Sequence, residues 1–433
     1  MTDQQQNASE VWAARYAHLV GVGINYLPQT IGEIDYWLRE LVARVDTVRE
    51  RDTTIDRAST WEPSVQGLAS LIEADPIIRM YVSEMIEEVP TEHRVITDTT
   101  HLLDALNLVI TRAPEYHYKP ANRNPFPMST IFAYMMMTQA GEAAFRNKAF
   151  NDQLRVVLQA WCALLDSSES LNVVTREGWL SLHAWEEFKL DDFFIPDPAD
   201  VHCGFTSFND FFHRFIKLEN RPVAEPDDPT VIVSPNDGTF YGYQFNIKRH
   251  DQFWIKGQPY SIADILNNGK YTDRFVGGSA FQTFLSGADY HRFHAPVSGF
   301  ILSAEIVPGL MFSDAESAGY DPDAGTKSLG YECSVNTRAL IYIQADYSPI
   351  GTVCVIPVGI TEISSIVLTQ TAGRVTKGDE LGYFSYGGST LCTLFQPGAV
   401  GKFAVTQPIP PGTKPPTLKV RAAMASTVPY NET

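Results

Sequence analysis

The sequence contains no run of apolar residues long enough to cross a membrane. A transmembrane helix needs about 18 consecutive apolar residues, and the apolar stretches at 128–137 and 355–360 are much shorter. The opening residues, MTDQQQNASE, are polar and include no apolar segment of the kind that a secretory signal requires. We therefore expect a soluble protein without a stable membrane anchor.

Cysteine and basic residues are also scarce. The 5 cysteines are scattered and show no CxxC spacing, which argues against a zinc site and a disulfide framework and favours a reducing, cytoplasmic compartment. Lysine and arginine number 33 against 51 aspartate and glutamate residues, so the formal net charge is −18. Binding to nucleic acid or to an anionic membrane surface needs clustered basic residues. We therefore predict neither kind of partner.

The first part of the chain has the spacing of apolar residues that is typical of helices. Hydrophobic residues make up 44% of the chain, enough for a large core. Residues 114–127 are rich in proline and asparagine and predict a loop. We expect residues 1–190 to form a helical domain. Its predicted helices cover residues 31–48, 64–86, 99–111, 129–145 and 152–165.

From about residue 191 onward, helical spacing gives way to short β-branched runs between glycine, proline and aspartate turns. Many short strands with frequent turns are typical of a β-sandwich or barrel. The predicted fold is therefore α+β, with a helical N-terminal domain and a β-rich domain over residues 191–433. Predicted strands include residues 231–233, 300–302, 340–343, 352–356, 363–368 and 402–406.

A serine behind two glycines, in the run YGGST at residues 386–390, can attack its own backbone. The Ser389 hydroxyl would add to the carbonyl of Gly388, and the N-to-O acyl shift gives an ester. β-Elimination then releases the upstream chain and leaves dehydroalanine, which hydrolyses to a pyruvoyl group. Its ketone can form a Schiff base with an amine and serve as the electron sink for decarboxylation. The chain would then make its own cofactor, and we expect no need for pyridoxal phosphate or a metal.

Two further motifs supply the groups that this reaction needs. A serine hydroxyl is a weak nucleophile until a base, usually histidine, takes its proton, and a carboxylate can orient that histidine. His291 and His294 lie in the run DYHRFHAP at 289–296, and Asp237 lies in the turn SPNDG after a predicted strand. Their odd spacing puts the two histidines on opposite faces of a regular strand, so both reach one site only where the strand turns or bulges.

Each motif has another interpretation when it is taken alone. A GGST run is most often a turn, Asp237 can be a turn-former, and two histidines can be a packed pair; only the combination indicates catalysis. Residues 373–381 are also similar to the hairpin of lipoyl and biotinyl carrier domains, which would make the β-rich part a non-catalytic module. Such carriers need a modified lysine within Met-Lys-Met or Asp-Lys-Ala, and the chain has neither. A folded chain that does not cleave is a further alternative.

Taken in order, the motifs resemble the phosphatidylserine decarboxylase family of pyruvoyl enzymes. The resemblance runs from about residue 205 to residue 423. It includes FTSFNDFF at 205–212, Arg221-Pro222, SPNDG at 234–238, IKGQPYS at 255–261, DYHRFHAP at 289–296 and KGDELGYFSYGGST at 377–390.

The resemblance implies a role for each of the candidate residues. Ser389 would become the pyruvoyl group, His294 would be the base of an Asp-His-Ser triad with Asp237, and His291 would assist decarboxylation. Cleavage between Gly388 and Ser389 would give a β chain of residues 1–388 and an α chain of residues 389–433, which stay together as partners.

Three features separate the chain from the usual membrane members of this family. Those enzymes read Leu-Gly-Ser-Thr at the cleavage site, where this chain has Gly387, and they carry an anchor or targeting segment and lack a long helical region. These features, with GITEIS at 359–364, LIEADP at 71–76 and RAP at 112–114, are similar to the soluble fungal L-tryptophan decarboxylases.

The resemblance therefore implies a small-molecule substrate, a free L-amino acid. L-tryptophan, converted to tryptamine and CO2, is the first candidate, and another amino acid is the second. Phosphatidylserine, converted to phosphatidylethanolamine, is the third. The residue patterns indicate no particular oligomeric state.

Overall fold

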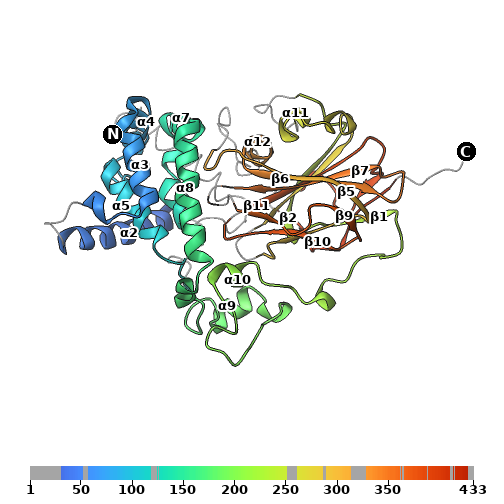
Figure 1. Cartoon of the computed structure of the whole chain (residues 1–433), viewed down its shortest axis with the longest axis horizontal. Coiled ribbons are helices and arrows are strands. Elements are labelled where there is room, and N and C mark those ends of the chain that lie inside the picture. Colours follow the sequence, from blue (N-terminus) through green and yellow to red (C-terminus); the bar gives the residue numbers. More distant parts are fainter. Residues whose placement is uncertain are drawn as a thin grey trace, which may run out of the picture. The chain divides into compact units, whose positions relative to one another are not determined.

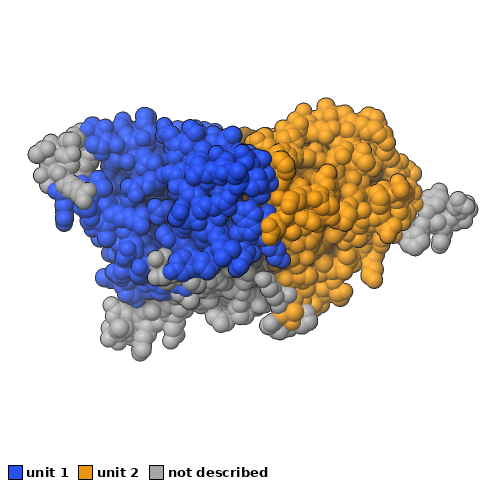
Figure 2. Space-filling view, turned by 90° about the horizontal axis from the view of Figure 1, so that it is seen from below, with its two compact units in different colours: residues 1–190, 195–211, 310–326 blue, residues 191–194, 212–309, 327–433 orange. Residues whose placement is uncertain are grey.

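The computed structural model describes residues 31–51, 57–118, 124, 126–250, 261–285, 289–313, 328–360, 362, 365–387, 389–409, 413 and 415–427. These residues form two compact units, which are coloured separately in Figure 2. The first contains the described parts of residues 1–190, 195–211 and 310–326, and the second those of 191–194, 212–309 and 327–433. The chain passes between the units more than once, so neither unit is one continuous stretch.

Helices dominate the N-terminal part of the chain, as the sequence predicts (Figure 1). No helix among the described residues is both long and apolar enough to span a membrane. The predicted loop at 114–127 is followed by a helix that begins at Pro127. The helices are α2 (Ile31–Arg51), α3 (Pro63–Ala74), α4 (Pro76–Glu87), α5 (Thr99–Ile110), α6 (Pro127–Phe132), α7 (Gln139–Arg146), α8 (Lys148–Leu165), α9 (Leu182–Glu187) and α10 (Phe208–Phe212).

The prediction of one helix over residues 64–86 is wrong. The structure has two helices there, α3 and α4, separated by Asp75. Proline at position 76 cannot donate an intrahelical hydrogen bond, but it fits the first turn of a new helix. The Asp75 carboxylate caps that turn by accepting hydrogen bonds from the backbone N–H groups of Ile77 (2.8 Å) and Ile78 (3.2 Å). The apolar spacing continues across the break, which explains the error.

The predicted helix at 129–145 is also interrupted. A 3-10 turn at Met135–Met137 lies between α6 and α7. Thr138 then caps α7, its hydroxyl accepting a hydrogen bond from the N–H of Gly141 (2.8 Å). Threonine at an N-cap satisfies a backbone donor that has no partner within the helix.

The second unit is built on antiparallel sheets, so the α+β prediction is confirmed (Figure 1). Its main sheet has eight strands in the order β13 (Thr417–Leu418), β2 (Gly238–Phe245), β3 (Ser279–Leu285), β11 (Ser389–Phe395), β7 (Thr352–Gly359), β6 (Arg338–Ala345), β5 (Gly299–Val307) and β9 (Gly373–Val375). One three-stranded sheet orders β1 (Val231–Val233), β14 (Ala423–Ser426) and β12 (Lys402–Phe403). The other orders β4 (Arg292–His294), β10 (Glu380–Phe384) and β8 (Ile366–Leu368). Two short helices, α11 (Ile262–Ile265) and α12 (Ser328–Val335), complete this unit.

Both faces of the main sheet are buried along its central strands. Successive side chains of a strand point to opposite faces. On β11, Leu391 and Phe395 belong to one apolar core, whereas Cys392 and Leu394 belong to another. By the same alternation Ser389, the first residue of β11, lies on the face of Leu391. The core on that face also contains Phe293 of β4, so the small β4-β10-β8 sheet packs into the same core.

Candidate active site

Ser389 is held on both sides by the main sheet. It begins β11, and its backbone lies opposite Leu285 of β3 and Gly359 of β7. Its side chain is fully buried, and its Oγ has no hydrogen-bond partner among the described residues. A buried hydroxyl without a partner costs about 1–3 kcal/mol and needs an explanation in a native fold. A hydroxyl that is kept available for a reaction provides one.

The neighbouring residue Thr390 shows that this burial does not itself prevent hydrogen bonding. Thr390 is as buried as Ser389, yet its hydroxyl donates to the Thr283 carbonyl (2.7 Å) and accepts from the Gln282 amide (2.9 Å). The two residues point to opposite faces of the sheet. The Thr390 hydroxyl is therefore satisfied on one face of the sheet, whereas the Ser389 hydroxyl is unsatisfied on the other.

The backbone just before Ser389 has a conformation that favours glycine. Gly387 has a φ of 136°, in a region that residues with a Cβ atom rarely adopt. Gly388, the other residue of the predicted cleavage site, lies outside the described residues. So does most of the IKGQPYS motif, of which only Ser261 is described.

His294, the predicted base for Ser389, is the last residue of β4 and is 3% exposed. Its Nδ1 lies 2.9 Å from the Gly378 carbonyl oxygen, and its Nε2 lies 3.0 Å from the Tyr290 hydroxyl. A carbonyl can only accept, so Nδ1 carries the proton and Nε2 accepts from Tyr290. Burial lowers the pKa of His294 to about 4. At neutral pH the ring is therefore neutral, with a basic Nε2.

The carbonyl that orients His294 is itself fixed by an arginine. Arg421 donates to the Gly378 oxygen from Nε (3.0 Å) and from Nη2 (2.7 Å). Two charge-assisted hydrogen bonds hold this acceptor in place, and the acceptor in turn holds the histidine tautomer. The orienting contact of His294 in this structure is thus a backbone carbonyl.

Asp237, the predicted carboxylate, is buried among positive charges. Its Oδ1 accepts from Arg221 Nε (3.1 Å) and from the Val420 N–H (2.7 Å), and its Oδ2 accepts from Arg221 Nη2 (2.8 Å) and Lys419 Nζ (3.0 Å). Burial alone would raise the pKa of Asp237, but the hydrogen bonds from Arg221 and the charge of Lys419 outweigh it and lower the pKa. Asp237 is therefore ionised at neutral pH.

The structure brings the three predicted motifs together through their backbones. The N–H of His294 donates to the Pro235 carbonyl (2.7 Å), and the N–H of Gly378 donates to the Ala295 carbonyl (2.8 Å). The side-chain hydrogen bonds of a triad are not among those of the described residues: Asp237 binds Arg221 and Lys419, and His294 binds Tyr290 and Gly378. The triad roles stay predictions.

The other predicted histidine, His291, precedes β4 and has no exposed surface. Its ring packs on Phe212, with ring centroids 4.0 Å apart, and neither ring nitrogen makes a hydrogen bond of ordinary geometry within the described part of the chain. Burial, aided by the charge of Arg214, lowers the pKa of His291 to about 3. Phe212 also contacts Tyr386, at 5.2 Å between centroids, and so links His291 to the segment that leads to Ser389.

Several residues of this region have structural roles that the sequence did not reveal. Tyr290 lies inside the recognised DYHRFHAP motif, but its bond to His294 depends on the turn before β4. Lys419 and Arg421 lie far along the chain from the groups they bind. A positive φ of 70° at Arg421 marks an unusual backbone, which the sequence alone does not show.

The two buried histidines predict a loss of stability in mild acid. Their pKa values are lowered in the folded state, so the unfolded chain binds more protons as the pH falls below the ordinary value of about 6.5. Each histidine then removes about 1.4 kcal/mol of stability per pH unit, or about 3–4 kcal/mol for both between about pH 7 and about pH 5. Urea unfolding at several pH values measures this slope. Replacing both histidines with glutamine should flatten the slope, and an unchanged slope would contradict the assignment.

Asp237→Asn is expected to lower the free energy of unfolding by about 3–5 kcal/mol, because the buried Arg221 loses its charged partner Asp237 and keeps only the longer, 3.4 Å contact to Asp192. The matched control is Asp346→Asn, whose partner Arg374 is exposed and whose loss should cost less than about 1 kcal/mol. Both are compared by urea unfolding in a Ser389→Ala background, which we expect to be uncut. Equal, small losses in the two variants would show that the Asp237 pair does not support the fold.

Comparison with known proteins places these features in a family. A family model described as phosphatidylserine decarboxylase matches residues 208–424, which include all four candidate residues. A second model with that description matches residues 62–188, within the helical part. The chain belongs to the phosphatidylserine decarboxylase family, and it is a decarboxylase of the pyruvoyl-dependent kind.

Individual relatives differ in how much of the chain they match. The decarboxylase iboD of Amanita muscaria is 37% identical over 323 residues, which are 68% of this chain and 92% of that protein. The L-tryptophan decarboxylase of Psilocybe cubensis is 31% identical over 355 residues, which are 76% of this chain and 79% of that protein. The phosphatidylserine decarboxylase proenzyme of Chlamydia caviae is 33% identical over 230 residues, 52% of this chain and 73% of that protein.

Proposed function

We propose that the chain cleaves itself at Ser389 and then decarboxylates a free L-amino acid, with L-tryptophan as the first candidate. The observation that carries the self-cleavage is the buried Ser389 Oγ, which starts a central strand and has no hydrogen-bond partner among the described residues. The same unpartnered Oγ is the reason to expect a pyruvoyl group at position 389. A hydroxyl oxygen that is due to leave with the upstream chain, before water supplies the ketone oxygen, needs no lasting partner.

The surroundings of Ser389 support the cleavage in two ways. The strand register on both sides fixes the serine backbone, so that the attacking oxygen has few alternative positions. His294 is neutral at physiological pH and can accept the serine proton at Nε2 once its hydrogen bond to Tyr290 opens. The fixed carbonyl of Gly378 keeps the other nitrogen protonated throughout.

The same region suits a decarboxylation after cleavage. A pyruvoyl group at position 389 would supply a ketone that holds the substrate amine and accepts the electrons released with CO2. Phe212 packs on His291, and Tyr386 packs on Phe212; such aromatic packing excludes water from the reacting centre. A neutral His291 can keep or donate its ring proton there, which is the role that the family resemblance gives it.

The extent of the similarities supports a free amino acid as the substrate. The relative named L-tryptophan decarboxylase matches 76% of this chain, whereas the Chlamydia proenzyme named for phosphatidylserine matches 52%. The longer match must include part of the helical unit, because the family match to the β-rich part spans only residues 208–424. A helical region shared with an amino-acid decarboxylase favours the same class of substrate for both.

The test is CO2 release from a panel of substrates by the purified, processed protein. The panel contains L-tryptophan, the other common L-amino acids and phosphatidylserine in mixed micelles, each without added pyridoxal phosphate. We expect kcat/KM for L-tryptophan to exceed that for phosphatidylserine by at least about 100-fold, since a site formed for one head group rejects substrates that leave its polar groups unpaired. Faster turnover of phosphatidylserine than of every amino acid would overturn the proposal. A dependence on pyridoxal phosphate would overturn its chemistry.

A further inference from the structure

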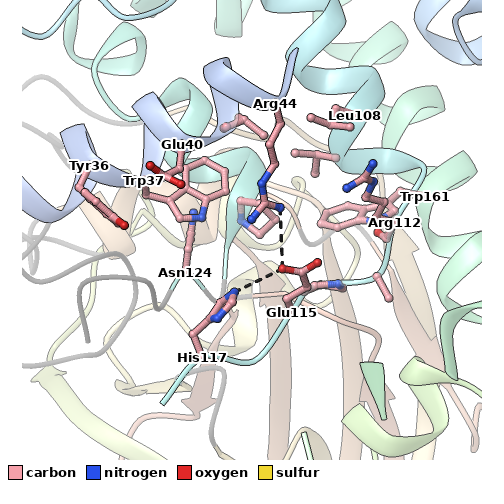
Figure 3. Close-up of a pocket in the computed structure, with 15 residues that line it drawn as sticks. Tyr36, Trp37, Glu40, Arg44, Leu108, Arg112, Glu115, His117, Asn124 and Trp161 are labelled. Atoms are coloured by element: carbon pink, nitrogen blue, oxygen red, sulfur yellow. Dashed lines mark hydrogen bonds and ion pairs between the residues drawn. The ribbon is translucent and has the colours of Figure 1, made fainter. Parts of the chain in front are cut away.

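A pocket of about 120 Å³ lies in the helical unit and shares no residue with the candidate active site (Figure 3). Its wall is one face of α2, the C-terminal end of α5 and the segment that follows it. Trp161 and Asn124 are buried at the pocket, whereas Tyr36 and Glu40 are exposed. The pocket therefore has one end inside the unit and one end open to solvent.

The size and the apolar lining of the pocket suit one aromatic ring system. Trp37, Leu41, Leu108 and Trp161 contribute apolar surface. Trp161 is held in place because its Nε1 donates to the Arg112 carbonyl (2.8 Å). A closed cavity of about 150 Å³ in another protein holds benzene. This pocket is somewhat smaller but open at one end, so it suits one aromatic ring system whose remaining atoms lie at the mouth. A lipid chain or a peptide helix would need far more space.

Asn124 provides a buried donor at this pocket. Its Oδ1 accepts from the Phe126 N–H (3.0 Å) and from the Thr130 hydroxyl (2.9 Å), which fixes the orientation of the amide. Its Nδ2 is buried and has no partner among the described residues, and the residue is 6% exposed. Buried donors in native folds are nearly always bonded. Asn124 therefore points to a ligand that brings an acceptor atom.

Charges of both signs surround the same pocket. Figure 3 shows Arg44 and His117 converging on Glu115, at 3.8 Å and 3.3 Å. The hydrogen bond from His117 lowers the pKa of Glu115, so this carboxylate stays ionised and already has partners. Glu40 lies one helical turn before Arg44 on α2, but the two are not ion-paired. Among the described residues, the ion pair of Arg44 is the 3.8 Å contact to Glu115, and the guanidinium retains donors for a further acceptor.

We propose that this pocket binds a free aromatic amino acid in its zwitterionic form. The ring packs on the apolar wall that includes Trp37 and Trp161. The carboxylate accepts hydrogen bonds from Arg44 and Asn124, and the ammonium group lies at the Glu40 carboxylate. An aromatic acid would lack the ammonium group that Glu40 can attract, and an aromatic amine would leave the buried Asn124 donor without an acceptor. The site is additional to the catalytic one, and it does not depend on which substrate is decarboxylated.

The test is isothermal titration of the full-length Ser389→Ala variant, which has no serine to convert and so should not consume the ligand. The probes are L-tryptophan, L-phenylalanine, tryptamine (which lacks the carboxylate) and indole-3-propionate (which lacks the ammonium group). We expect one site per chain that binds L-tryptophan at least about 10-fold more tightly than either truncated analogue. Glu40→Gln should remove the advantage over indole-3-propionate, and Arg44→Ala should remove the advantage over tryptamine.

Two outcomes would overturn this proposal. One is the absence of binding at millimolar amino acid. The other is binding that neither Glu40→Gln nor Arg44→Ala weakens, which would place the ligand elsewhere, as in the active site. Glu73→Gln, an exposed change on α3 away from the pocket, is the matched control and should leave affinity unchanged. Glu40 and Arg44 line a pocket outside the active site, so the effect of changing them does not depend on whether tryptophan is the substrate.

Discussion

A chain that carries Ser389→Ala is expected to stay a single polypeptide of 433 residues and to release no CO2 from any amino acid. The change removes the hydroxyl oxygen that attacks the preceding peptide and then departs with the upstream chain, so no dehydroalanine can form at position 389 and no ketone can follow. It should not damage the fold, because the Ser389 hydroxyl makes no hydrogen bond among the described residues. Removing a buried, unpartnered hydroxyl is neutral or stabilising. Denaturing electrophoresis and a CO2 assay measure the two effects.

The matched control for this variant is Ser385→Ala. Ser385 is also buried and lies four residues earlier, after β10, so its loss tests whether any small change near the turn prevents cleavage. We expect the control protein to be cut and active. A Ser389→Ala chain that is cut would remove the proposed mechanism, and a Ser385→Ala chain that stays whole would make the first result uninformative about the nucleophile.

His294→Ala is expected to slow self-cleavage by about 10²–10⁴-fold, the usual contribution of a general base. Burial lowers the pKa of His294 to about 4, so the wild-type ring is already neutral well below physiological pH. The cleavage rate should therefore stay level from about pH 8 to about pH 5 and fall only as the pH approaches 4. A histidine of ordinary pKa would instead lose activity between about pH 7 and about pH 5.5. Single-turnover cleavage of freshly refolded chain measures this profile.

His291→Ala separates the two reactions that the site is proposed to perform. We expect this variant to cleave itself at a normal rate and then to decarboxylate poorly, because His291 is assigned to the second reaction. His183→Ala, which changes a histidine on α9 in the other unit, should leave both reactions intact. Normal cleavage by His294→Ala would remove the base assignment, and full turnover by His291→Ala would leave that histidine only a structural role.

The sequence predicts the strands that a short run of neighbouring apolar residues defines. The short run at 231–233 coincides with β1, and the runs at 340–343 and 352–356 lie within β6 and β7, because buried strands there are continuous and β-branched. The break between α3 and α4 was missed because the apolar spacing continues across Pro76.

The site is predicted less completely than the fold, for a different physical reason. Family motifs supply the serine, the two histidines and the aspartate. They do not supply the contact between Asp237 and Lys419, which lie 182 residues apart, or the Gly378 carbonyl that orients His294. Backbone groups carry no sequence signature, and long-range ion pairs depend on the sheet order. The pocket in the helical unit also depends on such contacts.

The most direct test of self-cleavage at Ser389 is the intact mass of the purified wild-type protein under denaturing conditions. The account predicts two fragments, residues 1–388 and residues 389–433, with the smaller one carrying a ketone in place of its N-terminal amine. A single species of 433 residues that stays whole over time would contradict it. Ser389 would then be a buried strand residue in a chain that has the fold of the family without its chemistry.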